Sequence, residues 1–271
     1  MKGNLRNKMK DKMRKRIHIL PNFVTACNLV MGVNAIMIAL GAFANNDFSD
    51  KRLTKAAMCV FLGMIFDVFD GLVARLTKTS SRFGMELDSL ADLVTFGVAP
   101  SVLMYVFVLQ TIPAPMKKFV VPCCMVYTCC AALRLARFNA QIEDEGKTFS
   151  GIPTPEAAGV IISYLLLLSH GYLTPDNHIH IFIHDYFMPF LMVGLGLLMV
   201  ATVRFPAPAK QIVWQRHPFV YLVLIVFLLV ALIARPGLVL PCIFVGYLVY
   251  GLLQAARRAI FPPKPKEEPQ E

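Results

Sequence analysis

Apolar runs recur along nearly the whole chain, and they leave room for little besides transmembrane helices. Each is close to the roughly 20 residues that a helix needs to cross about 30 Å of hydrocarbon. Because a bilayer offers backbone groups no water, helices that satisfy their own hydrogen bonds are the expected structure. We therefore predict an all-α polytopic membrane protein with about eight transmembrane helices, at residues 21–42, 56–75, 87–110, 116–138, 156–173, 187–204, 218–234 and 238–256.

Composition supports this class, since 56% of the residues are hydrophobic and only 16% are charged. Residues 1–18 carry eight basic residues, and Asp11 is their one acid. They form either a surface helix held by anionic lipid headgroups or a disordered basic tail. We expect membrane lipids, and no nucleic acid, to be the partner of this charge. The predicted organisation is a basic cytoplasmic juxtamembrane segment at 1–19, an integral membrane domain at 20–256 and a disordered cytoplasmic tail at 257–271.

The distribution of lysine and arginine predicts the orientation. With a cytoplasmic N-terminus, 21 of the 27 basic residues fall on the cytoplasmic side. This bias follows the positive-inside rule and predicts that both termini lie in the cytoplasm. A bacterial-type cytoplasmic (inner) membrane is the expected location.

Cysteines and histidines carry little functional signal. The seven cysteines lie within apolar runs, where a thiol behaves as a small hydrophobe, so neither a disulfide framework nor a zinc site is favoured. His178, His180 and His184 fall in a loop predicted to lie on the far side of the membrane, and an ordinary interfacial loop is favoured over a metal site there.

Four aspartates stand out in the segment DVFDGLVARLTKTSSRFGMELDSLAD. Asp67 and Asp70 are three apart and Asp88 and Asp92 four apart, so each pair projects from one helical face. A short turn over about 76–84 would bring the two faces together. Carboxylates inside a membrane are costly and usually functional. Hard divalent ions such as Mg²⁺ or Mn²⁺ would neutralise such a cage, and two of them suit phosphoryl transfer.

Two other interpretations remain open for the aspartates. They can form buried ion pairs with Arg75, Arg82, Arg134 and Arg137, although such pairs give little net stability. They can also form a proton or ion relay, as in transporters. Ion pairing does not explain the spacing of the aspartates. A relay does not call for Gly71, which allows close approach of a ligand, or for Arg75, which offers a two-pronged contact to phosphate.

The spacing of these residues resembles the full signature of the CDP-alcohol phosphotransferase family. The positions that carry the resemblance are Asp67, Asp70, Gly71, Ala74, Arg75, Gly84, Asp88 and Asp92. The resemblance implies a core of six transmembrane helices within the predicted eight, and a reaction in which an alcohol displaces CMP from a CDP-linked substrate. It further implies that Asp67, Asp70 and Asp88 bind metal, and that Asp92 is the general base and also touches the second metal. Gly71, Arg75 and Ser81 would contact the CDP-lipid, together with Ala74 and Gly84.

Three weaker stretches resemble those of bacterial phosphatidylserine synthases and narrow the choice of acceptor alcohol. The first, LPNFVTACNLVMG at 20–32, contains Asn22, Thr25 and Asn28, whose side chains can read cytosine or ribose, or simply start and pack a helix. The others are LRLARFN at 133–139 and FSGIPTPEAAG at 149–159. Arg134 and Arg137 can clamp the serine carboxylate, or serve as ordinary topology anchors.

The expected reaction is therefore transfer of the phosphatidyl group from CDP-diacylglycerol to L-serine, which gives phosphatidylserine and CMP. A homodimer is expected from the resemblance. The alternatives are another acceptor, such as inositol phosphate, glycerol phosphate or choline, or a non-enzymatic ion or lipid transporter.

Overall fold

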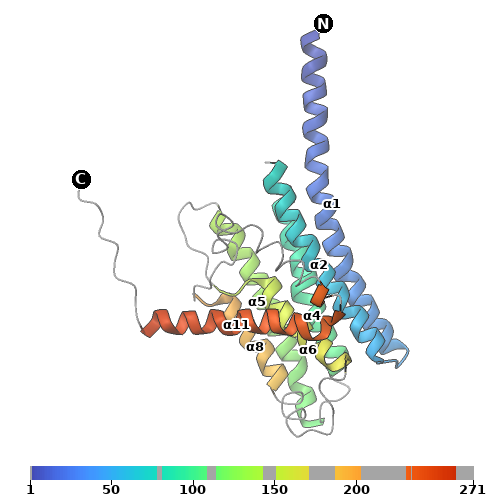
Figure 1. Ribbon diagram of the computed structural model, residues 1–271, viewed down its shortest axis with the longest axis vertical. Coiled ribbons are helices and arrows are strands. Elements are labelled where there is room, and N and C mark those ends of the chain that lie inside the picture. The colour runs from blue at the N-terminus through green and yellow to red at the C-terminus, as the bar shows by residue number, and fades with distance from the viewer. Residues whose placement is uncertain are drawn as a thin grey trace, which may run out of the picture.

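The computed structural model describes residues 2–77, 81–108, 114–142, 151–170, 187–202, 230–232 and 234–260. For residues 2–20, 75, 77, 108, 114–116, 141, 142 and 259 it describes only the backbone. Within these ranges every regular element is a helix and there is no strand, which confirms the all-α prediction (Figure 1).

The helices of the described residues follow the predicted apolar runs. They are α1 (Lys2–Ala44), α2 (Asp50–Thr77), α3 (Arg82–Asp92), η1 (Leu93–Val98), α4 (Ala99–Leu103), η2 (Met104–Val108), α5 (Ala114–Ile142), α6 (Thr154–Ser169), α8 (Met188–Val200) and α11 (Pro236–Ile260). Five stretches are long and apolar enough to cross a membrane: Pro21–Ala44, Asp50–Ala74, Arg82–Phe107, Lys117–Ala140 and Pro236–Arg258. Most of the predicted span at 218–234 lies outside the described residues.

Three predicted elements differ in extent or direction. The basic N-terminal segment is helical and continuous with the first span as α1, so a separate surface helix does not form. The third span begins at Arg82, ahead of the predicted 87, because Ser81 caps it and charge there had masked the helix from hydropathy. In Figure 1, α11 crosses α5, α6 and α8 instead of running beside them.

The helices α1 and α2 form an antiparallel hairpin that supports the rest of the bundle. Small buried side chains line its contact, including Ala35, Ala39, Ala56 and Ala57, and they let the two backbones approach closely. At the turn, Arg52 pairs with Asp47 at 2.7 Å. Hydrogen bonding from Ser49 and the nearby Arg52 guanidinium lower the pKa of Asp47.

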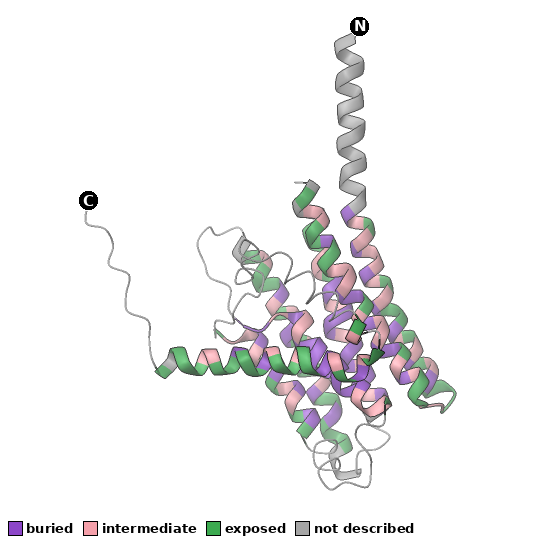
Figure 2. Ribbon diagram, in the orientation of Figure 1, coloured by how far each residue is buried: buried purple, intermediate pink, exposed green. Residues whose placement is uncertain are grey.

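The third span, Arg82–Phe107, is the most buried of the five and contains two π-helical segments, η1 and η2 (Figure 2). Pro100 lacks an N–H and therefore cannot donate to the carbonyl of Phe96 one turn earlier. The hydroxyl of Tyr127 on α5 takes that place and donates to the Phe96 oxygen at 2.9 Å. This bond joins α5 to the π segment that follows Asp92.

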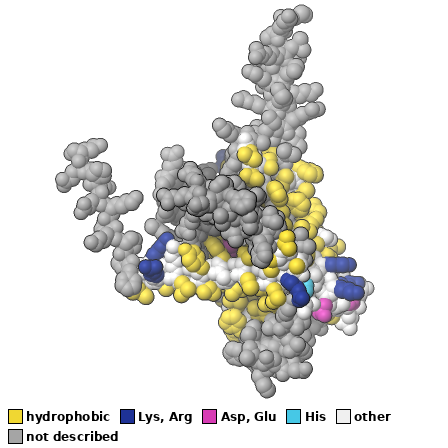
Figure 3. All heavy atoms as spheres, in the orientation of Figure 1, with side chains coloured by type: hydrophobic (Ala, Val, Ile, Leu, Met, Phe, Trp, Pro, Cys, Tyr) yellow, Lys and Arg dark blue, Asp and Glu magenta, His cyan; other side chains and the backbone are white. Residues whose placement is uncertain are grey.

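The outer face is apolar over much of its described area. Hydrophobic side chains cover the middle of the view in Figure 3, and charged side chains gather at its ends. Exposed side chains of this kind include Phe23, Met37, Phe69, Met125 and Leu253. Such a surface matches a protein that contacts lipid.

Candidate active site

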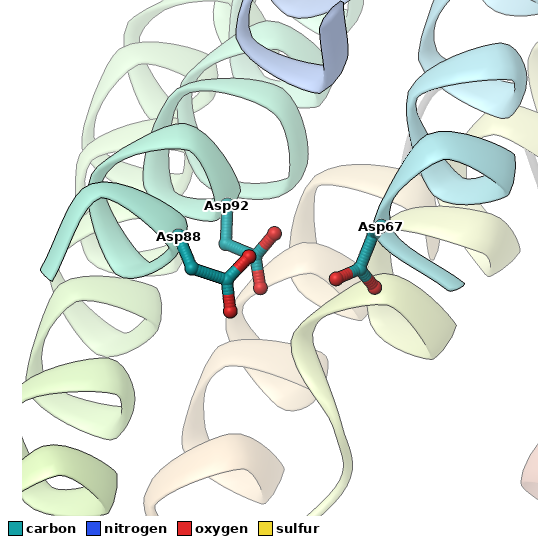
Figure 4. A group of neighbouring side chains, drawn as sticks. All are labelled: Asp67, Asp88 and Asp92. Carbon is teal, nitrogen blue, oxygen red and sulfur yellow. The ribbon is translucent and has the colours of Figure 1, made fainter. Parts of the chain in front are cut away.

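Three of the four aspartates meet between α2 and α3. Figure 4 shows Asp88 and Asp92 projecting from one helix towards Asp67 on the other. One carboxylate oxygen from each lies within 4.8 Å of the others. Asp92 is buried, whereas Asp67 and Asp88 are half-buried. The spacing of the aspartates on the two helices predicts this meeting.

Asp92 is held by a side chain from α1. Asn28 is fully buried, and its Nδ2 donates a hydrogen bond to Oδ1 of Asp92 at 3.1 Å. Thr95, three residues after Asp92 and within η1, donates its hydroxyl to the backbone oxygen of Asn28 at 3.1 Å. The π-helical segment thus fixes Thr95 against the residue that holds Asp92. Such segments occur frequently at functional sites.

Two glycines make room for this contact. Gly32 on α1 and Gly63 on α2 both lie against Thr95. A Cβ at Gly63 would come within 2.6 Å of Cγ2 of Thr95 and 3.0 Å of Oδ1 of Asn28. The three helices α1, α2 and η1 therefore pack closely around Thr95, near the aspartates.

The fourth aspartate, Asp70, is oriented differently. It is buried and accepts a hydrogen bond from the hydroxyl of Thr25. It still interacts electrostatically with Asp67 and Asp88. Asp70 therefore adds charge to the cluster, and Thr25 fixes its orientation.

A pocket of about 120 Å³ opens beside the cluster. Its lining includes nine residues that the sequence singles out, together with Pro21 and Met85. The nine are Asn22, Thr25, Asp67, Asp70, Gly71, Ala74, Ser81, Gly84 and Asp88. Pro21 is also the residue at which the apolar stretch of α1 begins. The pocket therefore lies at the end of the bundle where the basic segment of α1 joins the membrane span.

Ser81 and Arg75 relate to this pocket in different ways. Ser81 caps α3, since its Oγ accepts a hydrogen bond from the backbone N–H of Gly84 at 3.0 Å. Its hydroxyl therefore has a structural partner while it lines the pocket. Arg75 continues α2 one residue past Ala74, and its side chain lies outside the described residues.

The two arginines of α5 are separated by the fold. Arg134 is half-buried, donates to Oγ1 of Thr154 at 3.3 Å and interacts electrostatically with Asp92. Arg137 is exposed and donates to the carbonyl of Val200 at the end of α8, at 3.0 Å. Arg134 therefore borders the acidic cluster, whereas Arg137 joins α5 to α8.

The loop before α6 is fixed to the same region. Gly151 has a φ of 88°, a left-handed conformation that favours glycine, and a Cβ there would overlap the carbonyl of Met199. Ile152 donates its N–H to the carbonyl of Leu198 at 3.2 Å. These contacts hold the following Thr154 where it meets Arg134.

The cluster satisfies the requirements of a site for a hard cation. Its ligand atoms are all carboxylate oxygens, the type that Mg²⁺ and Mn²⁺ prefer. Oδ1 of Asp88 is buried and has no hydrogen-bond partner. Within the described side chains, none of the four aspartates forms an ion pair with Arg134 or Arg137, so these arginines do not supply the neutralising contact. A metal can bind here.

Comparison with known proteins agrees with the geometry. Residues 18–203 match the family model described as CDP-alcohol phosphatidyltransferase. The chain belongs to this family. The matched range contains the complete acidic cluster and every residue of its pocket, and a CDP-alcohol phosphatidyltransferase is a membrane enzyme of phospholipid biosynthesis.

Three curated relatives of this CDP-alcohol phosphatidyltransferase carry the name CDP-diacylglycerol–serine O-phosphatidyltransferase. The relative from Helicobacter pylori is 34% identical over 240 residues, which are 88% of this chain and 91% of that protein. The relative from Bacillus subtilis is 36% identical over 191 residues, 70% of this chain and 91% of its own. The relative from Methanocaldococcus jannaschii is 30% identical over 243 residues, which are 90% of this chain and 97% of that protein.

Sequence reasoning missed two features of this CDP-alcohol phosphatidyltransferase site. It offered Asn28 a contact with the nucleotide or a packing role, and it did not foresee the hydrogen bond from Asn28 to Asp92. It also passed over Glu156, which lies two residues beyond Thr154 and interacts electrostatically with Asp67 and Arg134. The signal for Glu156 was present, since an acid at the start of an apolar run is as costly as the aspartates.

Proposed function

We propose that the protein transfers the phosphatidyl group of CDP-diacylglycerol to the hydroxyl of L-serine, giving phosphatidylserine and CMP. The observation that carries the proposal is the meeting of Asp67, Asp88 and Asp92 beside a pocket lined by signature residues. The names of the relatives support serine as the acceptor.

In this proposal Asp67, Asp70, Asp88 and Asp92 hold two divalent cations, Mg²⁺ or Mn²⁺. The unpartnered Oδ1 of Asp88 and the all-oxygen ligand set support this assignment. When bound, such cations would screen the phosphate oxygens and stabilise the charge that develops during transfer.

Asp92 serves as the general base. A serine hydroxyl is a poor nucleophile until a carboxylate accepts its proton. As the serine oxygen bonds to the phosphorus that carries the diacylglycerol, the bond from that phosphorus to the CMP oxygen breaks. The hydroxyl proton passes to Asp92, and CMP leaves with the electron pair. Asn28 keeps the carboxylate oriented for this transfer through its hydrogen bond.

The CDP-lipid occupies the pocket between α1, α2 and α3. Asn22, Thr25, Gly71, Ala74, Ser81 and Gly84 line it. Arg75, the remaining signature residue, binds phosphate oxygens from the end of α2. The exposed apolar faces of the helices let the acyl chains remain in the bilayer while the head group enters the pocket.

The site faces the cytoplasm of a cell whose inner membrane holds the protein. The pocket adjoins Pro21, where the strongly basic segment of α1 ends and its apolar span begins, and basic segments remain in the cytoplasm. Serine and CMP exchange with that side. The working form is a homodimer, as the family resemblance implies.

A panel of radiolabelled alcohols with CDP-diacylglycerol and purified full-length protein tests the proposal. Labelled lipid and equimolar CMP should appear with L-serine, and not with inositol phosphate, glycerol phosphate or choline. Incorporation of another alcohol in place of serine would reassign the acceptor. Absence of CMP release with every alcohol would favour a transporter.

A further inference from the structure

Arg134 and Glu156 carry opposite charges but do not pair. They interact electrostatically, yet within the described part of the chain no ion pair of 4 Å or less joins them. Each also has a buried polar atom without a hydrogen-bond partner, Nε of Arg134 and Oε2 of Glu156. Buried groups of this kind are strongly destabilising when unsatisfied. Their arrangement therefore fits a ligand that contacts both side chains.

The two side chains border the acidic cluster on separate helices. Arg134 extends from α5 and acts electrostatically on Asp92, while Glu156 extends from α6 and acts on Asp67. A group held between Arg134 and Glu156 is therefore next to the carboxylate that we assign as the base.

The helix α11 covers this region from outside. It crosses α6 in Figure 1, and a Cβ at Gly159 would overlap the ring of Phe244. One turn from each of these residues lie Glu156 and Tyr247, which interact electrostatically. The crossing helix thus keeps Glu156 away from lipid.

We infer that Arg134 and Glu156 form a site for an amino acid zwitterion, in which Arg134 binds the carboxylate and Glu156 binds the ammonium group. This inference rests on the proposed function and names the residues that would select serine. Glycerol phosphate and inositol phosphate have no ammonium group, and choline has no carboxylate, so each would leave one buried charge unsatisfied. A buried polar group without its partner is a strong basis for rejecting an analogue.

Analogues of serine that lack its hydroxyl cannot accept the phosphatidyl group, so their inhibition constants measure binding alone. L-alanine carries both charges, propionate lacks the ammonium group and ethylamine lacks the carboxylate. Against L-serine and the wild-type protein, L-alanine should inhibit at concentrations at least about tenfold lower than either of the others, because charge-assisted contacts in a buried site are strong. Equal inhibition by all three would overturn the inference without any variant.

The variant Glu156→Gln then assigns the ammonium contact. It should raise both the KM for serine and the inhibition constant of L-alanine by about tenfold or more. The inhibition constant of propionate and the KM for CDP-diacylglycerol should stay within about twofold of the wild-type values. Asp50→Asn, the same loss of charge at the far end of α2, is the control and should change none of them.

The results of these experiments distinguish a failure of this inference from a failure of the proposed function on which it rests. If the wild-type protein transfers nothing to serine, the proposed function fails. If the wild-type protein does transfer the phosphatidyl group to serine, but Glu156→Gln raises the inhibition constants of propionate and L-alanine equally, then Glu156 does not bind the ammonium group. Thermal unfolding in detergent accompanies each variant, and Glu156→Asp, which keeps the charge, should recover part of the affinity for L-alanine.

Discussion

The amide of Asn28 lies 3.1 Å from the carboxylate of Asp92 and donates to it, in a part of the bundle where Asn28 has no exposed surface. The contact joins α1 to the helix that carries Asp88 and Asp92. In the proposed mechanism, in which Asp92 is the base, the contact makes Asn28 a positioning residue, and this role is open to a direct test.

Asn28→Ala should lower kcat by about 10- to 100-fold, because a hydrogen bond to a charged group is worth about 1.5–3 kcal/mol. The KM for CDP-diacylglycerol should change little. Steady-state CMP release measures both. Asn34→Ala is the matched control, since Asn34 is on the same helix but contacts Cys59. A raised KM with normal kcat would instead support the role in nucleotide binding that the sequence indicates.

Asp92→Asn should reduce CMP release by about 10²- to 10⁴-fold, the range of a lost general base. The protein should remain folded, because the change removes one of three like charges that lie close together. Initial rates and thermal unfolding in detergent are the measurements, with Asp47→Asn at the α1–α2 turn as the control. Retention of most activity would remove Asp92 as the base.

Removal of divalent cations should stop turnover. With excess EDTA the clustered carboxylates lose the charges that screen the substrate phosphates. CMP release should return when Mg²⁺ or Mn²⁺ is restored above the chelator concentration, and Ca²⁺ serves as a comparison ion. Unchanged activity in EDTA would contradict the assignment of Asp67, Asp70, Asp88 and Asp92 as metal ligands.

Gly63→Ala should destabilise the protein by about 1–3 kcal/mol, since the new methyl group would press on Thr95. The drop in melting temperature in detergent measures this. Adding Thr95→Ser removes the Cγ2 atom in the way and should restore part of the loss. Gly194→Ala is the control, because nothing lies within 4 Å of its new Cβ. Equal effects at the two glycines would show that close packing at Thr95 is unimportant.

Tyr127→Phe should cost about 1–3 kcal/mol of stability by leaving the buried carbonyl of Phe96 without a donor. Pro100 has no N–H to replace it. Thermal unfolding again provides the measurement, and the exposed Tyr250→Phe is the control. A melting temperature equal to that of the control would mean that another donor reaches the Phe96 carbonyl.

The sequence predicted the helical class and the meeting of the aspartates because both follow from periodicity and burial cost. Spacing along two helices places Asp67 and Asp88 on facing surfaces wherever the connection is short. Hydropathy could not place the start of α3, since the charged residues Arg82, Glu86 and Asp88 near that start resemble those of a loop.

Contacts that depend on packing were beyond the sequence. Asn28 lies in a stretch that resembles a substrate-binding motif, and only the close approach of α1 to η1 shows that Asp92 is its partner. Arg134 and Arg137 look equivalent at a spacing of three, yet α8 engages Arg137 and leaves Arg134 beside the acids. The direction of α11 likewise depends on its contact with α6 and not on its own composition.

The residues that we assign to CDP-lipid cleavage and those that we assign to serine binding lie in different parts of the chain. Among the described residues, those that line the pocket all lie between Pro21 and Asp88, whereas Arg134 and Glu156 come later on α5 and α6. Under the proposed function, changes in the later helices would alter which alcohol is accepted while the machinery for cleaving the CDP-lipid stays intact. Such a division would give natural selection, and protein engineers, a way to exchange one phospholipid head group for another on an unchanged catalytic base.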